Sequence, residues 1–204
     1  MKKYVLYLCF VIVVLGSFVF MSNTRINETS YTPFTNEVNN NLLYSSGSPG
    51  GLTGSLGDEG KTCTSCHDVG TAYNLAPTIT TNIPETGYEL DVSYTITVTA
   101  TSDASRHGFE LTAEKDADYS KVGEFNIIGS TGSPQLISGG DGAGNVTHSN
   151  NTSTSWSFNW TASGTDEGSI TFYAAVLAGN GSGTNNDQTV TQSLSMVQNT
   201  LSIS

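Results

Sequence analysis

The chain has 204 residues, and its seven Lys and Arg residues face 18 Asp and Glu residues, which gives a formal net charge of −11 at pH 7. This length allows one domain with a hydrophobic core, together with a leader and a linker. An acidic surface of this kind repels nucleic acid and anionic lipid, so neither is expected as a partner.

The N-terminus has the pattern of a secretory signal. Lys2 and Lys3 precede a largely apolar run at residues 4–20. We expect residues 1–22 to be a signal peptide or an uncleaved N-terminal membrane anchor, because a run of this length reaches the lower limit for a membrane span. The protein is therefore expected to be exported, to the periplasm, the outer cell surface or the medium.

The segment after the leader has no hydrophobic period. Residues 23–60 are rich in Asn, Ser and Gly, a composition that is typical of a flexible, solvated linker. The predicted organisation is thus a leader, a linker at 23–60 and a folded part at 61–204.

Cys63-Thr64-Ser65-Cys66-His67 is the motif with the most specific chemistry. Two thiols three positions apart can each bond one vinyl group of a porphyrin, and the adjacent imidazole can then ligate the iron, as in c-type haem. A disulfide or redox dithiol and half of a zinc site are the alternatives. Zinc would need further ligands, and a thioredoxin-like dithiol would need a βαβ pattern. We expect one covalent haem c on Cys63 and Cys66, with His67 as the proximal ligand.

From residue 88 onward the hydrophobic period is two, which predicts half-buried strands. The strong alternations lie at 94–100, 107–114, 156–160, 170–174 and 190–196, and the weaker ones at 122–128, 135–138 and 200–203. Gly- and Asn-rich breaks separate them, and no segment of the body shows a 3.6-residue period. This pattern predicts an all-β fold, an immunoglobulin-like antiparallel β-sandwich.

The second axial position of the expected haem has three candidates. Met196 shares its parity with Leu194 and is better explained by core packing. His107 shares its parity with Phe109, at a strand start where a hydrogen-bonded histidine is the usual role. His148 follows a glycine-rich loop, and loops on a rigid sandwich often carry binding groups. We expect His148 as the distal ligand, with His107 or an open iron as alternatives.

Several short motifs occur in a characteristic order between residues 47 and 197. They are Leu52-Thr53-Gly54, Thr62 to His67, Tyr94 to Val98, Gly108 to Ala113, Thr147-His148, Trp156 to Thr161 and Thr171 to Ala175. In this order they resemble the choice-of-anchor V proteins of Bacteroidetes-type bacteria, which are related to the reeler domain. The resemblance implies an exported, reeler-type β-sandwich with the C-x-x-C-H motif as a haem site and a histidine at the position of His148.

Two functions of different classes are compatible with these features. The first is an exported monohaem cytochrome-like domain for extracytoplasmic electron transfer or haem-based sensing, whose acidic surface would favour a redox partner with a basic docking surface. Aromatic side chains would then pack near the macrocycle, with Trp156, Phe158, Trp160 and Tyr173 as the candidates. The alternative is a non-catalytic binding or adhesion module at the cell surface with a disulfide between the two cysteines of the motif.

A haem enzyme is the weakest alternative. It would need an arginine and a base near an open iron, and Arg106 beside His107 is the sole neighbouring pair of this kind in the sequence. We expect an electron carrier or a binding protein rather than an enzyme, with no catalytic residue.

Overall fold

The computed structural model describes residues 44–200. The predicted signal or anchor at 1–22 lies outside the described residues, as do residues 23–43 of the predicted linker and nearly all of the predicted strand at 200–203. In the described part of the chain, no helix has the length and apolarity that a membrane crossing requires.

Nine strands and one short 3-10 helix form the described part of the chain. In chain order they are η1 (Cys63–Ser65), β1 (Ala76–Thr81), β2 (Ser93–Thr101), β3 (Arg106–Lys115), β4 (Glu124–Thr131), β5 (Pro134–Leu136), β6 (Val146–His148), β7 (Ser155–Thr161), β8 (Ile170–Gly179) and β9 (Gln188–Met196).

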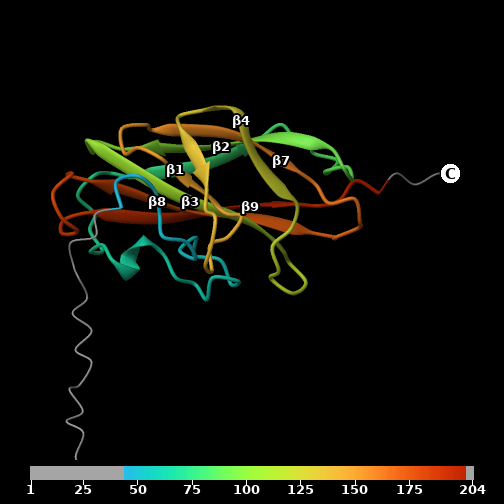
Figure 1. Cartoon of the computed structure of the whole chain (residues 1–204), viewed down its shortest axis with the longest axis horizontal. Helices are drawn as coiled ribbons and strands as arrows, with labels where there is room; N and C mark the ends of the chain where they lie inside the picture. Colours follow the sequence, from blue (N-terminus) through green and yellow to red (C-terminus); the bar gives the residue numbers. More distant parts are fainter. Residues whose placement is uncertain (1–43, 201–204) are drawn as a thin grey trace, which may run out of the picture. The chain divides into compact units, whose positions relative to one another are not determined.

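The strands form two antiparallel sheets. One sheet has the order β1-β2-β7-β4, and the other has the order β5-β6-β3-β8-β9. The two sheets lie one over the other, and the blue and teal segment that precedes β1 runs along the five-stranded sheet (Figure 1). The prediction of an all-β antiparallel sandwich is confirmed.

The core lies between the sheets because one face of each central strand is apolar. On β7, Trp156, Phe158 and Trp160 alternate with Ser and Asn and are at most 2% exposed. Trp160 packs edge-to-face against Phe172 of β8, with ring centroids 5.1 Å apart. The expectation that these aromatic side chains surround a cofactor is wrong, because they fill the core instead. Tyr173 is half-buried on the opposite face of β8.

The hydrophobic pattern of the sequence did not predict two of the strands. β1 contains Pro77, which has no N–H to donate and is tolerated because β1 is an edge strand. β6 has only three residues, too few for any period to show, and it pairs with the preceding strand β5 and with the more distant β3. The sequence suggested that His148 is part of a loop, but it is the last residue of a strand.

β3 is buried on both faces, unlike the half-buried strands of the other sheet. Its inner face carries Phe109 and Leu111, and its outer face carries Glu110 and Glu114, which are at most 1% exposed. Residues 44–60 cover this outer face. This part of the predicted linker differs from the sequence-based expectation, because hydrogen bonds hold it against the sandwich.

Candidate functional site

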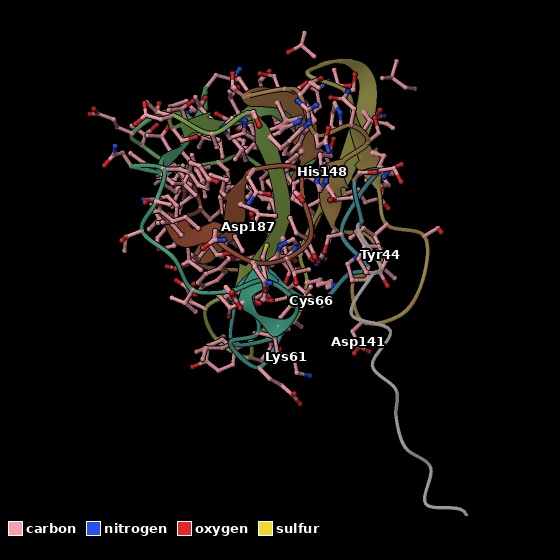
Figure 2. All side chains as sticks on the ribbon, turned by 90° about the vertical axis from the view of Figure 1, so that its left-hand side faces the viewer. Tyr44, Lys61, Cys66, Asp141, His148 and Asp187 are labelled. Carbon is pink, nitrogen blue, oxygen red and sulfur yellow. The ribbon has the colours of Figure 1, made fainter. Side chains whose placement is uncertain are left out.

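A cavity of about 180 Å³ lies at the end of the sandwich where β3 begins and where β6 and β8 end. Its apolar lining includes Pro49, Leu52, Phe109 and Leu177. Figure 2 looks at this end and shows that Tyr44, Cys66, His148 and Asp187 reach it from four separate segments. We refer to it as the end cavity.

The segment before β1 forms one wall of the end cavity because two carboxylates of β3 hold it in place. Glu110 accepts hydrogen bonds from Ser48 Oγ (2.5 Å) and from the Gly51 N–H (2.8 Å). Glu114 accepts from Ser55 Oγ (2.6 Å) and from the Gly57 N–H (3.1 Å). Asn145 Nδ2 donates a further hydrogen bond of 2.8 Å to Glu110. Burial raises the pKa of Glu114, and the hydrogen bonds from Ser55 and Gly57 together with the positive charge of Lys121 offset this rise only in part.

The C-x-x-C-H motif forms one turn of 3-10 helix in this wall. The Thr62 hydroxyl caps the turn by accepting from the Thr64 N–H (3.2 Å), and the N–H groups of Cys66 and His67 both donate to the Cys63 carbonyl (3.1 and 2.9 Å). Such a turn needs only a few residues, and the small polar side chains of the motif suit it.

The two cysteines of the turn are free thiols with different surroundings. Cys63 is partly buried, whereas Cys66 is exposed. Burial raises the pKa of the Cys63 thiol to about 12, and the negative charge of Glu110 contributes to this shift. Cys63 is therefore mostly protonated at neutral pH, and little of its reactive thiolate forms.

His67 is fixed by a residue that lies far away in sequence. Its Nδ1 lies 2.6 Å from Oδ2 of Asp187, and the Asp187 side chain is only 3% exposed. The next residue, Asp68, donates its N–H to the Thr184 carbonyl (2.9 Å). The β8–β9 loop thus holds the C-terminal end of the turn.

His148 is buried, and its ring has polar partners on both sides. The Phe109 N–H donates to Nδ1 (3.2 Å), which places the proton on Nε2, where it faces the Tyr44 carbonyl (3.3 Å). Burial lowers the pKa of His148, which is therefore neutral at pH 7. Gly108 allows this ring to approach the sheet, because a Cβ at that position would lie 2.6 Å from His148 Cε1.

His107 and Arg106 open β3 at the edge of the end cavity. His107 is 4% exposed, its Nε2 lies 2.6 Å from Ser102 Oγ, and burial lowers its pKa. Arg106 is exposed and uses one guanidinium N–H for the Ser105 carbonyl (2.9 Å). Its remaining donors are available at the cavity mouth.

The structure brings together most of the residues that the sequence singled out. Cys63, Cys66, His67, His107 and His148 all line the end cavity. Met196 does not line it and packs at the edge of the core, where it pairs with Ile170. The sequence analysis missed Asp187, because an Asp in an Asn- and Gly-rich stretch is a common turn residue.

The fold and the end cavity define a β-sandwich domain with a binding-type pocket at one end. A family model for the reeler domain matches residues 61–182, more than half of the chain. The chain belongs to the reeler domain family. Reeler domains are non-catalytic modules that occur in extracellular or secreted proteins, in line with the expected export.

Three similar solved structures are of F-spondin. Two crystal structures of the human F-spondin reeler domain share 19% and 18% sequence identity with this chain, with TM-scores of 0.46 and 0.45. They cover 65% and 64% of this chain and 91% and 95% of their own. A crystal structure of the Reelin-N domain of F-spondin has 20% identity and a TM-score of 0.45, and covers 67% of this chain and 94% of its own. No curated protein matches the chain.

These findings correct the predicted haem. Within residues 44–200, no group of three or more His, Cys, Asp and Glu side chains is arranged to hold a metal ion. Reeler domains are binding- or adhesion-type modules and not haem proteins. The predictions of a covalent haem c, of metal binding and of electron transfer are therefore wrong. The choice of Cys63, Cys66, His67 and His148, with His107 as the alternative, as site residues stays a prediction. His67 uses Nδ1 for its contact with Asp187, and both ring nitrogens of His148 have protein partners.

Proposed function

We propose that this reeler domain is a non-catalytic, extracellular binding module that holds a small apolar group of its ligand in the end cavity. The observation that supports this most directly is the cavity itself, which four separate chain segments build and which apolar side chains line. Concave, mostly apolar sites with a few polar groups are the usual form of small-ligand sites. The proposal thus follows the binding alternative; the two thiols that this alternative paired are free in this structure.

The size and lining of the end cavity suggest the class of ligand. A volume of about 180 Å³ suits a group no larger than a substituted aromatic ring or a short branched chain. Phe109, Leu52 and Leu177 provide apolar contacts, and burial of apolar area contributes about 25 cal/mol per Å² to binding. Arg106 at the mouth, with free guanidinium donors, favours a carboxylate on the ligand.

The polar residues of the wall set the orientation of the ligand rather than its affinity. His148 and His67 have protein partners already, so they act as rigid walls. Cys63, Cys66, His67 and His148 remain the candidate site residues under this proposal, now as cavity lining.

Titration with phenylacetate, followed by amide chemical shifts in NMR, tests the proposal. Phenylacetate combines an aromatic ring with a carboxylate, and phenylethanol is a neutral probe of similar size. We expect shifts at Gly108, Phe109 and Cys66 that saturate for phenylacetate, with phenylethanol binding several-fold more weakly. Shifts that do not saturate, or that spread evenly over the surface, would contradict a binding site in the end cavity.

Two variants and a control locate the site. Leu177→Trp fills the cavity and should weaken phenylacetate binding by at least about tenfold, equivalent to about 1.4 kcal/mol. Arg106→Gln should remove the preference for phenylacetate over phenylethanol. Leu136→Trp changes an exposed leucine of β5, 41% exposed and outside the cavity lining, and should leave binding unchanged. Equal binding by Leu177→Trp and the control would overturn the proposal.

The wider setting of the module is part of the same proposal. The acidic surface favours a macromolecular partner with a basic surface and disfavours nucleic acid. The resemblance to choice-of-anchor V proteins supports display at the outer cell surface, while the leader at 1–22 supports export to the periplasm or the medium.

A further inference from the structure

We propose that Cys63 and Cys66 form a redox-active thiol pair that closes into a disulfide by attack of the exposed Cys66 on an external disulfide, followed by ring closure from Cys63. The proposal concerns the thiols alone and does not depend on ligand binding in the end cavity. Three features of the structure support it: the position of the two cysteines on the turn, their unequal exposure, and the attachment of the turn at both ends.

The turn brings the two cysteines close along the chain, with Cys63 as the first residue of η1 and Cys66 as its C-cap. A 3-10 helix has three residues per turn, so side chains at positions i and i+3 lie one above the other. Cys63 and Cys66 have this spacing, and the Cys66 N–H donates to the Cys63 carbonyl at 3.1 Å. Short range and shared orientation are the geometric conditions for a disulfide.

The unequal exposure of the thiols sets the order of the steps. Cys66 is exposed and can reach an external disulfide, whereas Cys63 is partly buried. The Cys66 thiolate attacks one sulfur of the external disulfide and breaks its S–S bond, which releases one thiol and leaves a mixed disulfide on Cys66. Cys63 then loses its proton to solvent and attacks the Cys66 sulfur, and the second external thiolate leaves and is protonated.

The oxidation of the protein thiols is balanced by the reduction of the external disulfide. Two protein thiols are oxidised to one disulfide, and one external disulfide is reduced to two thiols. A small disulfide such as oxidised glutathione, or the disulfide of an extracytoplasmic thiol oxidoreductase, is the chemical class of the oxidant. Exported proteins meet such oxidants routinely, and disulfides persist in their compartments.

The turn is attached to the molecule on both sides, so closing the disulfide affects the wall of the end cavity. On one side, Thr62 pairs with Thr53 in a β-bridge, and the Gly54 N–H donates to the Lys61 carbonyl at 2.7 Å. On the other side, His67 contacts Asp187. A disulfide between these two anchored ends removes freedom from the wall and protects the amides of Cys66 and His67.

The experiment uses the full chain with Cys9→Ser, so that Cys63 and Cys66 are its only thiols. The protein is equilibrated in mixtures of reduced and oxidised glutathione, quenched with acid, alkylated with a maleimide and weighed as an intact molecule. We expect both thiols to disappear together, with the loss of two hydrogens and no bound glutathione in the oxidised form. A protein that stays reduced, or that carries glutathione on one or both cysteines, would overturn the proposal.

Single variants test the order of the steps. Cys63→Ser should stop the reaction at glutathione bound to Cys66. Cys66→Ser should react at least about tenfold more slowly, because little thiolate forms on a buried thiol. Equal rates for the two variants would contradict the assigned order. Near-UV circular dichroism from the buried Trp156 and Trp160 verifies that each variant is folded.

A matched variant tests the role of the spacing. Cys63→Ser combined with Thr64→Cys leaves two thiols on the same turn at positions i and i+2, which point in different directions. This variant should form at least about tenfold less disulfide than the natural pair under the same glutathione mixture. Hydrogen exchange of the Cys66 and His67 amides should slow on oxidation of the natural pair alone. Efficient closure of the shifted pair would show that the turn does not direct the reaction.

Discussion

The two faces of β3 are both buried, but they are buried in different ways. The inner face carries Phe109, Leu111 and Ala113, which pack against the other sheet and are at most 1% exposed. The outer face carries Glu110 and Glu114, which are just as inaccessible but accept hydrogen bonds from the segment 48–57.

The difference between the faces shows how one strand serves two purposes. Apolar contacts are non-directional and hold the two sheets together. The carboxylates accept directional hydrogen bonds and hold one short segment in one register. Buried carboxylates that lose their donors are strongly unfavourable. The inner face therefore stabilises the domain as a whole, whereas the outer face determines where the wall of the end cavity lies.

The largest expected effect comes from the inner face. Leu111→Ala removes a fully buried side chain that does not line the end cavity. We expect the free energy of unfolding to fall by about 2–5 kcal/mol, from lost burial and the remaining void. Urea unfolding followed by tryptophan fluorescence measures this. Leu136→Ala, at a 41% exposed position, is the control and should change little. Equal effects of the two variants would show that the inner face is not the main source of stability.

The next effect comes from the outer face and should be local. Glu110→Ala leaves the donors of Ser48, Gly51 and Asn145 without their acceptor. We expect a loss of about 2 kcal/mol, together with faster proteolysis and hydrogen exchange within residues 44–60 at denaturant concentrations that leave the core folded. Loss of the core and of this segment in a single step would contradict the separation of the two faces.

A smaller effect should follow when only one donor is removed. Ser55→Ala removes the hydroxyl that donates to Glu114 Oε1, while the Gly57 N–H still donates to Oε2. We expect a loss of about 1 kcal/mol in urea unfolding. Thr80→Ala, at an exposed position on β1, is the control and should stay within about 0.5 kcal/mol of the natural protein.

The smallest effect concerns pH, where Glu114 and His148 act in opposite directions. Burial raises the pKa of Glu114 above 4.5, so its contribution to stability is complete below that pH and is lost as the pH rises through the raised value. Burial lowers the pKa of His148 below 6.5, so its contribution is complete above that pH and is lost as the pH falls through the lowered value.

Replacement of the histidine separates the two contributions. His148→Gln retains one acceptor and one donor but does not titrate. We expect this variant to lose less stability between pH 7 and pH 5 than the natural protein, by less than about 1 kcal/mol. Thermal unfolding at a series of pH values measures the difference. Parallel pH profiles for the two proteins would show that His148 is not the group that responds.

The sequence predicted the sandwich well because its strongest signal is local. Alternating apolar residues mark β2, β3, β7, β8 and the end of β9, and the structure contains these strands. The short β6 and the edge strand β1 with Pro77 give no such signal. The position of Glu110 on the polar face of an alternating strand predicted exposure to solvent, because nothing nearby in sequence indicates that residues 44–60 cover it.

The candidate site was harder to predict for the same reason. The sequence could select Cys63, Cys66, His67 and His148 by their chemistry, and the structure places all of them at the end cavity. It could not show that Asp187 contacts His67, since 120 positions separate them. A five-residue motif also suggested a cofactor that the family does not use, because the same spacing serves several chemistries.

The contact between His67 and Asp187 also has a consequence for the time course of synthesis. A chain emerges from its N-terminus, and long-range contacts form only after both partners are present. The residues of the turn with Cys63 and Cys66 have thus been synthesised while the 120 positions up to Asp187 are still being made. During this interval the turn is a solvated peptide with no wall behind it, and an enzyme that acts on either thiol meets it before the folded domain exists.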